Sequence, residues 1–349
     1  MAAPPITLLF LLALGLGTSL TFTSSHWLLA WMGLEINSLA ILPLLVSSHQ
    51  ARAIEASVKY LLIQATGAGI ILWGSLLNAQ ATGHWNILDT KEDLPTLIII
   101  SGLALKLGLA PLHAWLPEVI QGTDMTTAMI LSTWQKLAPF ILMCEVLPSH
   151  QWLALTLGLI SIVVGGLSGI NMTLMRKLLA YSSIAHLGWM MLVMTFSTHL
   201  ALIALMIYII ATTMIFSALH TTSASTINSL ALSWGKYPAL TALIPLILLS
   251  LGGLPPLSGF IPKWLIIQEL VNQNLILVAL LAAISALLSL YFYTRITYTL
   301  LCITTPNYFG LAPFKHYRQK YVTFLIPLLG VMTIMLLPTL PLLTAFFFS

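Results

Sequence analysis

The sequence predicts an all-α polytopic membrane protein of about eleven transmembrane helices, two of which are discontinuous. Three observations carry this prediction. The 349-residue chain is 59% hydrophobic and only 6% charged, whereas about a quarter of the residues in soluble proteins are charged. Long apolar stretches recur from one end of the chain to the other, which is typical of helices that cross a bilayer. Two of these stretches contain matching pairs of prolines.

Eleven spans can be placed along the chain, each near or above the ~20 residues that a helix needs to cross a bilayer. They cover roughly residues 3–22, 26–46, 55–77, 95–121, 124–146, 151–170, 178–195, 199–220, 238–271, 274–299 and 322–345. The N-terminus runs directly into apolar sequence, without a basic segment before it. Because a signal peptide opens with such a segment, we expect the first span to be retained.

The fourth and ninth spans are too long for one straight helix, and each contains a proline pair. Residues 108–118 and 253–263 share glycine, leucine, proline, leucine and proline at the same offsets. Because proline removes a backbone donor and clashes with the preceding turn, each pair predicts a broken helix. Breaks at corresponding places in two hydrophobic halves predict a transporter built from internal repeats, with its ion path at the breaks.

An odd number of spans places the two termini on opposite sides of the membrane, and the basic residues then fall almost entirely on one side. The loops on the N-terminal side are expected to hold Arg52, Lys59, Arg176, Lys177, Lys236, Arg295, Lys315, Arg318 and Lys320. Those on the other side hold only Lys91. By the positive-inside rule, the N-terminus faces the cytoplasm or matrix and the C-terminus the outer compartment.

Four ionisable residues fall well inside the predicted spans: Glu35, Lys106, Lys136 and Lys263. An ionised side chain at the bilayer centre costs at least ~2.5–3.5 kcal/mol, and such residues mark ion paths by default. A desolvated lysine releases its proton readily, and a nearby carboxylate restores its charged form. We therefore predict a proton relay in which Glu35 and Lys106 pair reversibly, Lys136 accepts the proton and Lys263 passes it outward. The alternative is that these groups form buried structural ion pairs.

Two histidines are weaker candidates for the same relay. His113 lies inside the first break, and His186 lies in the middle of a span. Imidazole exchanges protons near neutral pH, so either residue can bridge relay sites; a buried, hydrogen-bonded histidine is an equal alternative. Glu118 and Asp124 are candidates for a proton entrance, with solvated loop carboxylates as the alternative, and Glu269 is a minor candidate for an exit.

Several kinds of site are not predicted. The sequence contains no GxxxxGK[ST] loop, dinucleotide fingerprint, CxxC pair or HExxH motif, and these are the common signatures of nucleotide, redox and zinc sites. Its two cysteines, Cys144 and Cys302, are far apart in apolar surroundings. We therefore expect no cofactor and no metal in this chain, and the small, scattered net charge of +4 predicts no nucleic-acid partner.

Four segments carry a resemblance to a known family. Residues 105–118, 134–139, 178–188 and 252–264 are similar, in this order, to the signatures of the antiporter-like subunits of proton-pumping NADH:quinone oxidoreductase. The resemblance covers about residues 26–300. It implies a multi-pass protein of the membrane arm of respiratory complex I, in the mitochondrial inner membrane, with the N-terminus in the matrix and the C-terminus in the intermembrane space.

The resemblance also implies five-helix repeats of inverted topology, and the two predicted breaks agree with it because they lie five spans apart and run in opposite directions. The implied division is a first helix at 1–25, a first repeat at 26–150, a second repeat at 151–299, and a basic loop with a last helix at 300–349. In the family, the glutamate matched by Glu35 partners the lysine matched by Lys106, and the matches of Lys136 and Lys263 continue a polar axis.

The implied function is that of a proton-translocating subunit coupled to quinone reduction elsewhere in an NADH:ubiquinone oxidoreductase. NADH, FMN, iron–sulfur clusters and ubiquinone are then bound by other subunits, and the partners are other membrane-arm subunits, including antiporter-like neighbours, and membrane lipids. Two alternatives stay open: a stand-alone cation/proton antiporter, and a passive scaffold subunit. The first should transport cations when purified alone, whereas Lys106 variants of the second should fail to assemble.

Overall fold

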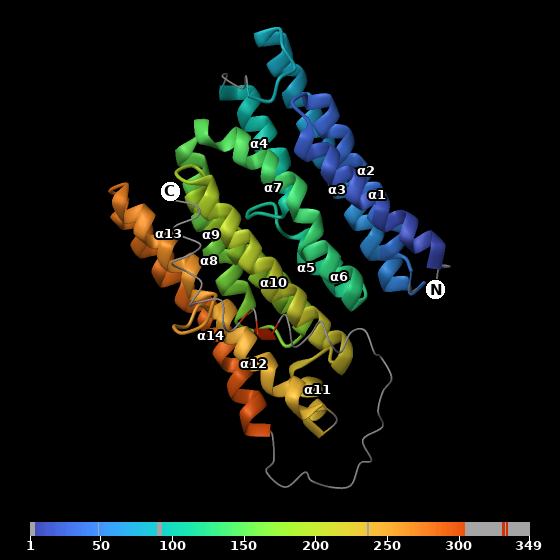
Figure 1. Cartoon of the computed structure of the whole chain (residues 1–349), viewed down its shortest axis with the longest axis vertical. Coiled ribbons are helices and arrows are strands. Elements are labelled where there is room, and N and C mark those ends of the chain that lie inside the picture. The colour runs from blue at the N-terminus through green and yellow to red at the C-terminus, as the bar shows by residue number, and fades with distance from the viewer. Residues whose placement is uncertain are drawn as a thin grey trace. The chain divides into compact units, whose positions relative to one another are not determined.

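The computed structural model describes residues 4–47, 49–88, 93–235 and 237–303, together with 330, 331 and 333, and these residues are overwhelmingly helical (Figure 1). The helices are α1 (Pro4–Thr23), α2 (Trp27–Leu45), α3 (Ala51–Thr82), α4 (Asp93–Leu107), α5 (Trp115–Gly122), α6 (Met125–Ser132), α7 (Trp134–Val146), α8 (Gln151–Gly169), α9 (Met175–Met194), α10 (Thr198–Thr222), α11 (Ile227–Leu232), α12 (Pro238–Gly252), α13 (Phe260–Asn272) and α14 (Ile276–Ile303), with 3₁₀ turns η1 (Leu147–Ser149) and η2 (Ser233–Gly235).

Within this described part, seven helices are long and apolar enough to cross a membrane: α1, α2, α3, α8, α9, α10 and α14. The predicted class, an all-α polytopic membrane protein, is therefore confirmed. Nearly all of the last predicted span, 322–345, and of the basic segment before it lies outside the described residues. The count of eleven spans and the inverted repeats stay predictions.

The chain divides into two compact units. The first comprises the residues up to Leu157 together with Met194–Phe196, and the second comprises Gly158–Val193 together with the residues from Ser197 onward. Helices α1 to α7 thus build the first unit, and α10 to α14 belong to the second. The predicted repeat boundary at residue 151 is not decided by this division.

Both predicted breaks are present, and both begin at a glycine. Gly108 (φ 76°) follows α4 and Gly253 (φ 80°) follows α12, in the left-handed conformation that ends many helices and favours glycine. The amide of Leu109 bonds the Ala104 carbonyl at 3.0 Å, so α4 closes before the first proline is reached. The first proline of each pair, Pro111 or Pro256, lies in the irregular segment, and the second, Pro117 or Pro262, lies in the first turn of the following helix, α5 or α13. The prolines therefore do not themselves end the preceding helices.

Some predicted boundaries were wrong in detail. The fifth span is interrupted at Thr133 (φ −116°, ψ −71°), between α6 and α7, although neither glycine nor proline stands there. Several basic residues assigned to loops lie inside helices instead, because α3, α9 and α14 continue beyond their apolar cores: Arg52, Lys59, Arg176, Lys177 and Arg295.

Glycines set how closely α3 and α4 approach. A Cβ on Gly102 would lie 2.8 Å from Ile71 Cγ1 and 3.0 Å from the Gly67 carbonyl oxygen. Small residues at facing positions let membrane helices pack backbone against backbone. This contact holds the last turn of α4, which carries Lys106, directly against α3.

Candidate functional site

Two of the predicted lysines line the same cavity in the first unit. Lys106 is contributed by α4 and Lys136 by α7, and both side chains are buried, at 6% and 3% exposure. The other residues that line this small cavity are Tyr60, Gln64, Leu107, Trp115, Leu116, Leu131 and Gln135. The two interruptions, at Gly108 and at Thr133, lie within three residues of the two lysines in sequence, so each lysine is close in the chain to irregular backbone.

Hydrogen bonds fix several walls of the cavity. Gln64 Nε2 donates to the Lys106 carbonyl at 3.4 Å, which links α3 to the last turn of α4. Trp115 Nε1 donates to the Leu105 carbonyl at 3.1 Å and so joins the two halves of the broken helix across the gap. Both bonds go to carbonyls near the C-terminal end of α4, where intrahelical donors run out; the Leu105 carbonyl also accepts from the Gly108 amide at 3.2 Å.

Glu35 lies on α2, near the cavity but not in direct contact with Lys106. The two described side chains form no ion pair within 4.0 Å. Glu35 Oε2 accepts a hydrogen bond from Ser38 Oγ at 3.0 Å. The Glu35 carboxylate is therefore held by its own helix, and its pairing with Lys106 stays a prediction.

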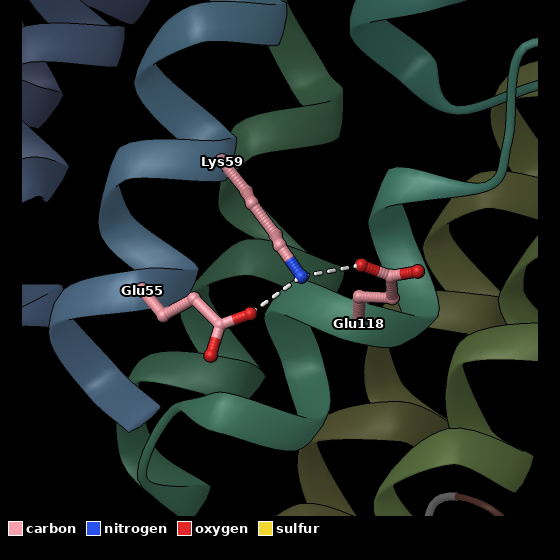
Figure 2. Close-up of polar contacts among 3 residues, drawn as sticks. All are labelled: Glu55, Lys59 and Glu118. Carbon is pink, nitrogen blue, oxygen red and sulfur yellow. Dashed lines mark hydrogen bonds and ion pairs between the residues drawn. The ribbon is translucent and has the colours of Figure 1, made fainter. Parts of the chain in front are cut away.

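An ion-pair triad on the exposed side of α3 joins this helix to α5. Lys59 Nζ lies 2.8 Å from Glu118 Oε2 and 2.7 Å from Glu55 Oε1, and Figure 2 shows the lysine reaching from α3 between the two carboxylates. Exposed ion pairs contribute little stability, so the main effect of the triad is to link α5 to α3. Beside it, the rings of Tyr60 and Trp115 meet edge to face with centroids 6.0 Å apart, and both rings line the cavity.

Lys263 lies in the second unit, where it closes the C-terminal end of α12. Its Nζ donates to the Gly252 carbonyl at 2.7 Å and to the Leu251 carbonyl at 3.3 Å. These carbonyls lack intrahelical donors and carry the negative end of the helix dipole. Gly253 leaves the space for this contact, because a Cβ there would lie 2.8 Å from Lys263 Cδ. Lys263 therefore has a structural role, whatever its role in proton transfer.

Replacing Lys263 with methionine is expected to lower the temperature at which the purified protein unfolds. The change removes two charge-assisted hydrogen bonds, each of which contributes ~1.5–3 kcal/mol, and leaves the last carbonyls of α12 without their donor. Thermal unfolding followed by loss of soluble, native-size protein measures the effect. Lys177→Met, which removes an amine from the first turn of α9, is the matched control. Equal unfolding temperatures for both variants would contradict the capping role.

The two candidate histidines occupy different settings. His186 lines a second small cavity, in the second unit, and its ring lies 5.5 Å from that of Tyr208. This cavity adjoins the second break, since Ser258 and Gly259 also line it. His113 lies in the first break, half-exposed, with Nδ1 3.2 Å from the Pro111 carbonyl oxygen, and it does not line the lysine cavity.

The remaining carboxylates are peripheral to the cavity. Glu118 belongs to α5 and is paired with Lys59, so it is not the free loop carboxylate that was considered. Asp124 precedes α6 without capping it through its side chain. Glu269 accepts from Gln273 at 3.3 Å. Within the described ranges, no cluster of three metal-ligating side chains occurs.

Sequence reasoning missed the neutral polar part of the site. Tyr60, Gln64 and Gln135 line the cavity together with the lysines, but none carries a charge that makes it stand out in an apolar span. A signal was present for the two glutamines, since a primary amide inside a predicted span also needs hydrogen-bond partners. Gln135 additionally neighbours Lys136 in sequence.

Buried ionisable residues beside interrupted membrane helices are typical of membrane transporters whose ion path lies at the breaks. A family model described as NADH:quinone oxidoreductase/Mrp antiporter, TM matches residues 24–289. The chain belongs to this family and, within it, to the group of NADH-ubiquinone oxidoreductase chain 2.

Relatives and solved structures support this assignment. The chain is 55% identical over 340 residues to NADH-ubiquinone oxidoreductase chain 2 of Gadus morhua, and 54% identical over 340 residues to that of Oncorhynchus mykiss, in both cases covering 97% of each protein. A chain of respiratory complex I from Thermus thermophilus is similar in structure, with a TM-score of 0.85 and 28% identity, over 96% of this chain and 79% of that one.

Proposed function

We propose that this chain is a core membrane-arm subunit of respiratory NADH:ubiquinone oxidoreductase, and that it translocates protons through a relay of Glu35, Lys106, Lys136 and Lys263. The family and the relatives support the place in the complex. The observation that carries the relay is the cavity shared by Lys106 and Lys136. Because both buried amines line the same small cavity, a proton can pass from one amine to the other through it.

The relay works by changing how well each amine holds a proton. Burial disfavours the charged form of lysine, and the carboxylate of Glu35 favours it at Lys106. When a change elsewhere in the complex weakens this interaction, the Lys106 ammonium releases a proton into the cavity and Lys136 accepts it. Lys263 then continues the path outward, with His186 as an intermediate at the second break and His113 as a weaker participant. The net movement is from the matrix to the outer side.

The rest of the assignment follows from this place in the complex. The protein lies in the mitochondrial inner membrane as a multi-pass protein, with its N-terminus in the matrix and its C-terminus in the intermembrane space. Other subunits bind NADH, FMN, the iron–sulfur clusters and ubiquinone, so this chain performs no redox chemistry. Its partners are neighbouring membrane-arm subunits, including antiporter-like ones, and lipids. The repeats are two inverted five-helix units, 26–150 and 151–299.

A native gel of membranes solubilised in mild detergent tests the assignment. The chain, located by mass spectrometry, is expected in a very large band that oxidises NADH in the gel. Migration as a small species without this activity would contradict it. That outcome would favour a stand-alone cation/proton antiporter, and ion flux in liposomes would then be the deciding measurement.

A further inference from the structure

The lysine cavity contains three polar side chains that the proposed relay does not use. They are Tyr60 and Gln64 of α3 and Gln135 of α7. The other lining side chains are leucines and Trp115, and the indole nitrogen of Trp115 is already bonded to the Leu105 carbonyl. A water molecule between the two lysines therefore finds its side-chain partners among these three residues and the amines themselves.

The hydrogen bonds of Gln135 determine which way the Tyr60 hydroxyl points. The Asn37 carbonyl can only accept, so the group of Gln135 that lies 3.2 Å from it is the amide nitrogen. The amide oxygen is then the group that lies 3.5 Å from the Tyr60 hydroxyl. Because an amide oxygen also only accepts, the hydroxyl donates its proton to Gln135. Its oxygen lone pairs remain free to accept a further hydrogen bond.

The ring of Tyr60 is held independently of this hydroxyl. The side chain is 2% exposed, and its ring packs edge to face on Trp115 at an interplanar angle of 61°. The adjacent residue, Lys59, ties α3 to α5 through Glu118. Removal of the hydroxyl alone therefore leaves the packing of the cavity wall in place.

We propose that the Tyr60 hydroxyl is the acceptor that stabilises the proton in passage between Lys106 and Lys136, and that Gln135 is the positioning residue that keeps this acceptor turned toward the cavity. The inference rests on the proposed relay and adds to it a hydrogen-bond acceptor between the two lysines. One N–H bond of the first ammonium breaks as a cavity water takes the proton, and one N–H bond of the second amine forms as that water gives it up. Tyr60 keeps its own proton throughout.

The test is a double-mutant cycle in the assembled complex, with Tyr60→Phe, Gln135→Leu and the two changes combined. Protons translocated and NADH oxidised by ubiquinone are measured together in liposomes, per amount of assembled complex. A hydrogen bond to a charged group corresponds to about a 10- to 100-fold change in rate, so each single variant is expected to slow coupled turnover by at least about tenfold. The double variant is expected to be no slower than either, because both changes remove the same acceptor.

Tyr291→Phe is the matched control, since it removes the same hydroxyl from a side chain that is 55% exposed on α14. Wild-type turnover and translocation in assembled Tyr60→Phe would overturn the inference, and so would additive losses in the double variant. If Tyr60→Phe does not assemble, Gln135→Leu carries the test alone, and a normal rate overturns the inference. Loss of translocation in Lys106→Met with normal Tyr60→Phe would leave the proposed function standing without this acceptor.

Discussion

A complex that carries Lys106→Met is expected to assemble normally but to translocate few or no protons. It is also expected to oxidise NADH with ubiquinone at least ~10-fold more slowly, because general acid–base steps contribute about 10²–10⁴-fold to rates. Methionine keeps an unbranched stem of similar length but has no amine. It can therefore fill the space beside Gly67, where the Lys106 Cγ lies 3.1 Å from the position of a Cβ. The relay loses its first proton carrier while the packing of α3 on α4 is kept.

The expected stability of this variant separates the relay from the scaffold alternative. Lys106 is 6% exposed and has no carboxylate within 4.0 Å among the described residues. A charge at the bilayer centre costs at least ~2.5–3.5 kcal/mol, so the removal of this buried amine relieves a cost and does not break an ion pair. A scaffold whose charges lock helices together requires the opposite result, namely a variant that fails to assemble.

Both the rate of NADH oxidation and the number of protons translocated are measured on reconstituted complex, after the assembled amount has been determined by native gel. Lys177→Met is the control, because Lys177 lies in the first turn of α9 and lines neither cavity. Full translocation by assembled Lys106→Met would remove Lys106 from the relay. A loss of assembly in Lys106→Met alone would support the scaffold.

The fold class was predictable because each membrane helix must satisfy its own backbone and face lipid, which leaves a long apolar run in the sequence. The two breaks were predictable from the prolines, but the points where the helices end were not. Helix α4 ends at Leu107 because Gly108 adopts a left-handed conformation. The position of the proline does not predict this end point. The interruption at Thr133 has no glycine or proline to mark it.

Only the charged residues of the site were predictable from the sequence. Lys106 and Lys136 stand out because charge inside an apolar span is costly, but their common cavity depends on how five helices, α3 to α7, pack. The role of Lys263 as a cap on α12 required the position of the Gly252 carbonyl. Tyr60 and Gln135 were missed because neutral polar residues are common in membrane helices, and only their hydrogen bonds distinguish them.

At the contact between α3 and α4, Gly102→Ala should greatly reduce the amount of folded protein and of assembled complex. The new Cβ would lie 2.8 Å from Ile71 Cγ1, 3.0 Å from the Gly67 carbonyl oxygen and 3.1 Å from the Ile71 amide nitrogen. Two of these three neighbours are backbone atoms and cannot rotate away, so α3 and α4 must separate. Overpacking of this kind costs ~1–3 kcal/mol.

The separation would also reach the cavity, because Gln64 bonds the Lys106 carbonyl across the same contact at 3.4 Å. Gly69→Ala is the matched control on α3, because a Cβ at Gly69 meets nothing within 4 Å. Replacing this helical glycine by alanine should stabilise the helix by up to ~1 kcal/mol. Assembled amount on native gels and the temperature of thermal inactivation distinguish the two variants. Equal behaviour of Gly102→Ala and Gly69→Ala would mean that the close approach of α3 and α4 does not hold the site together.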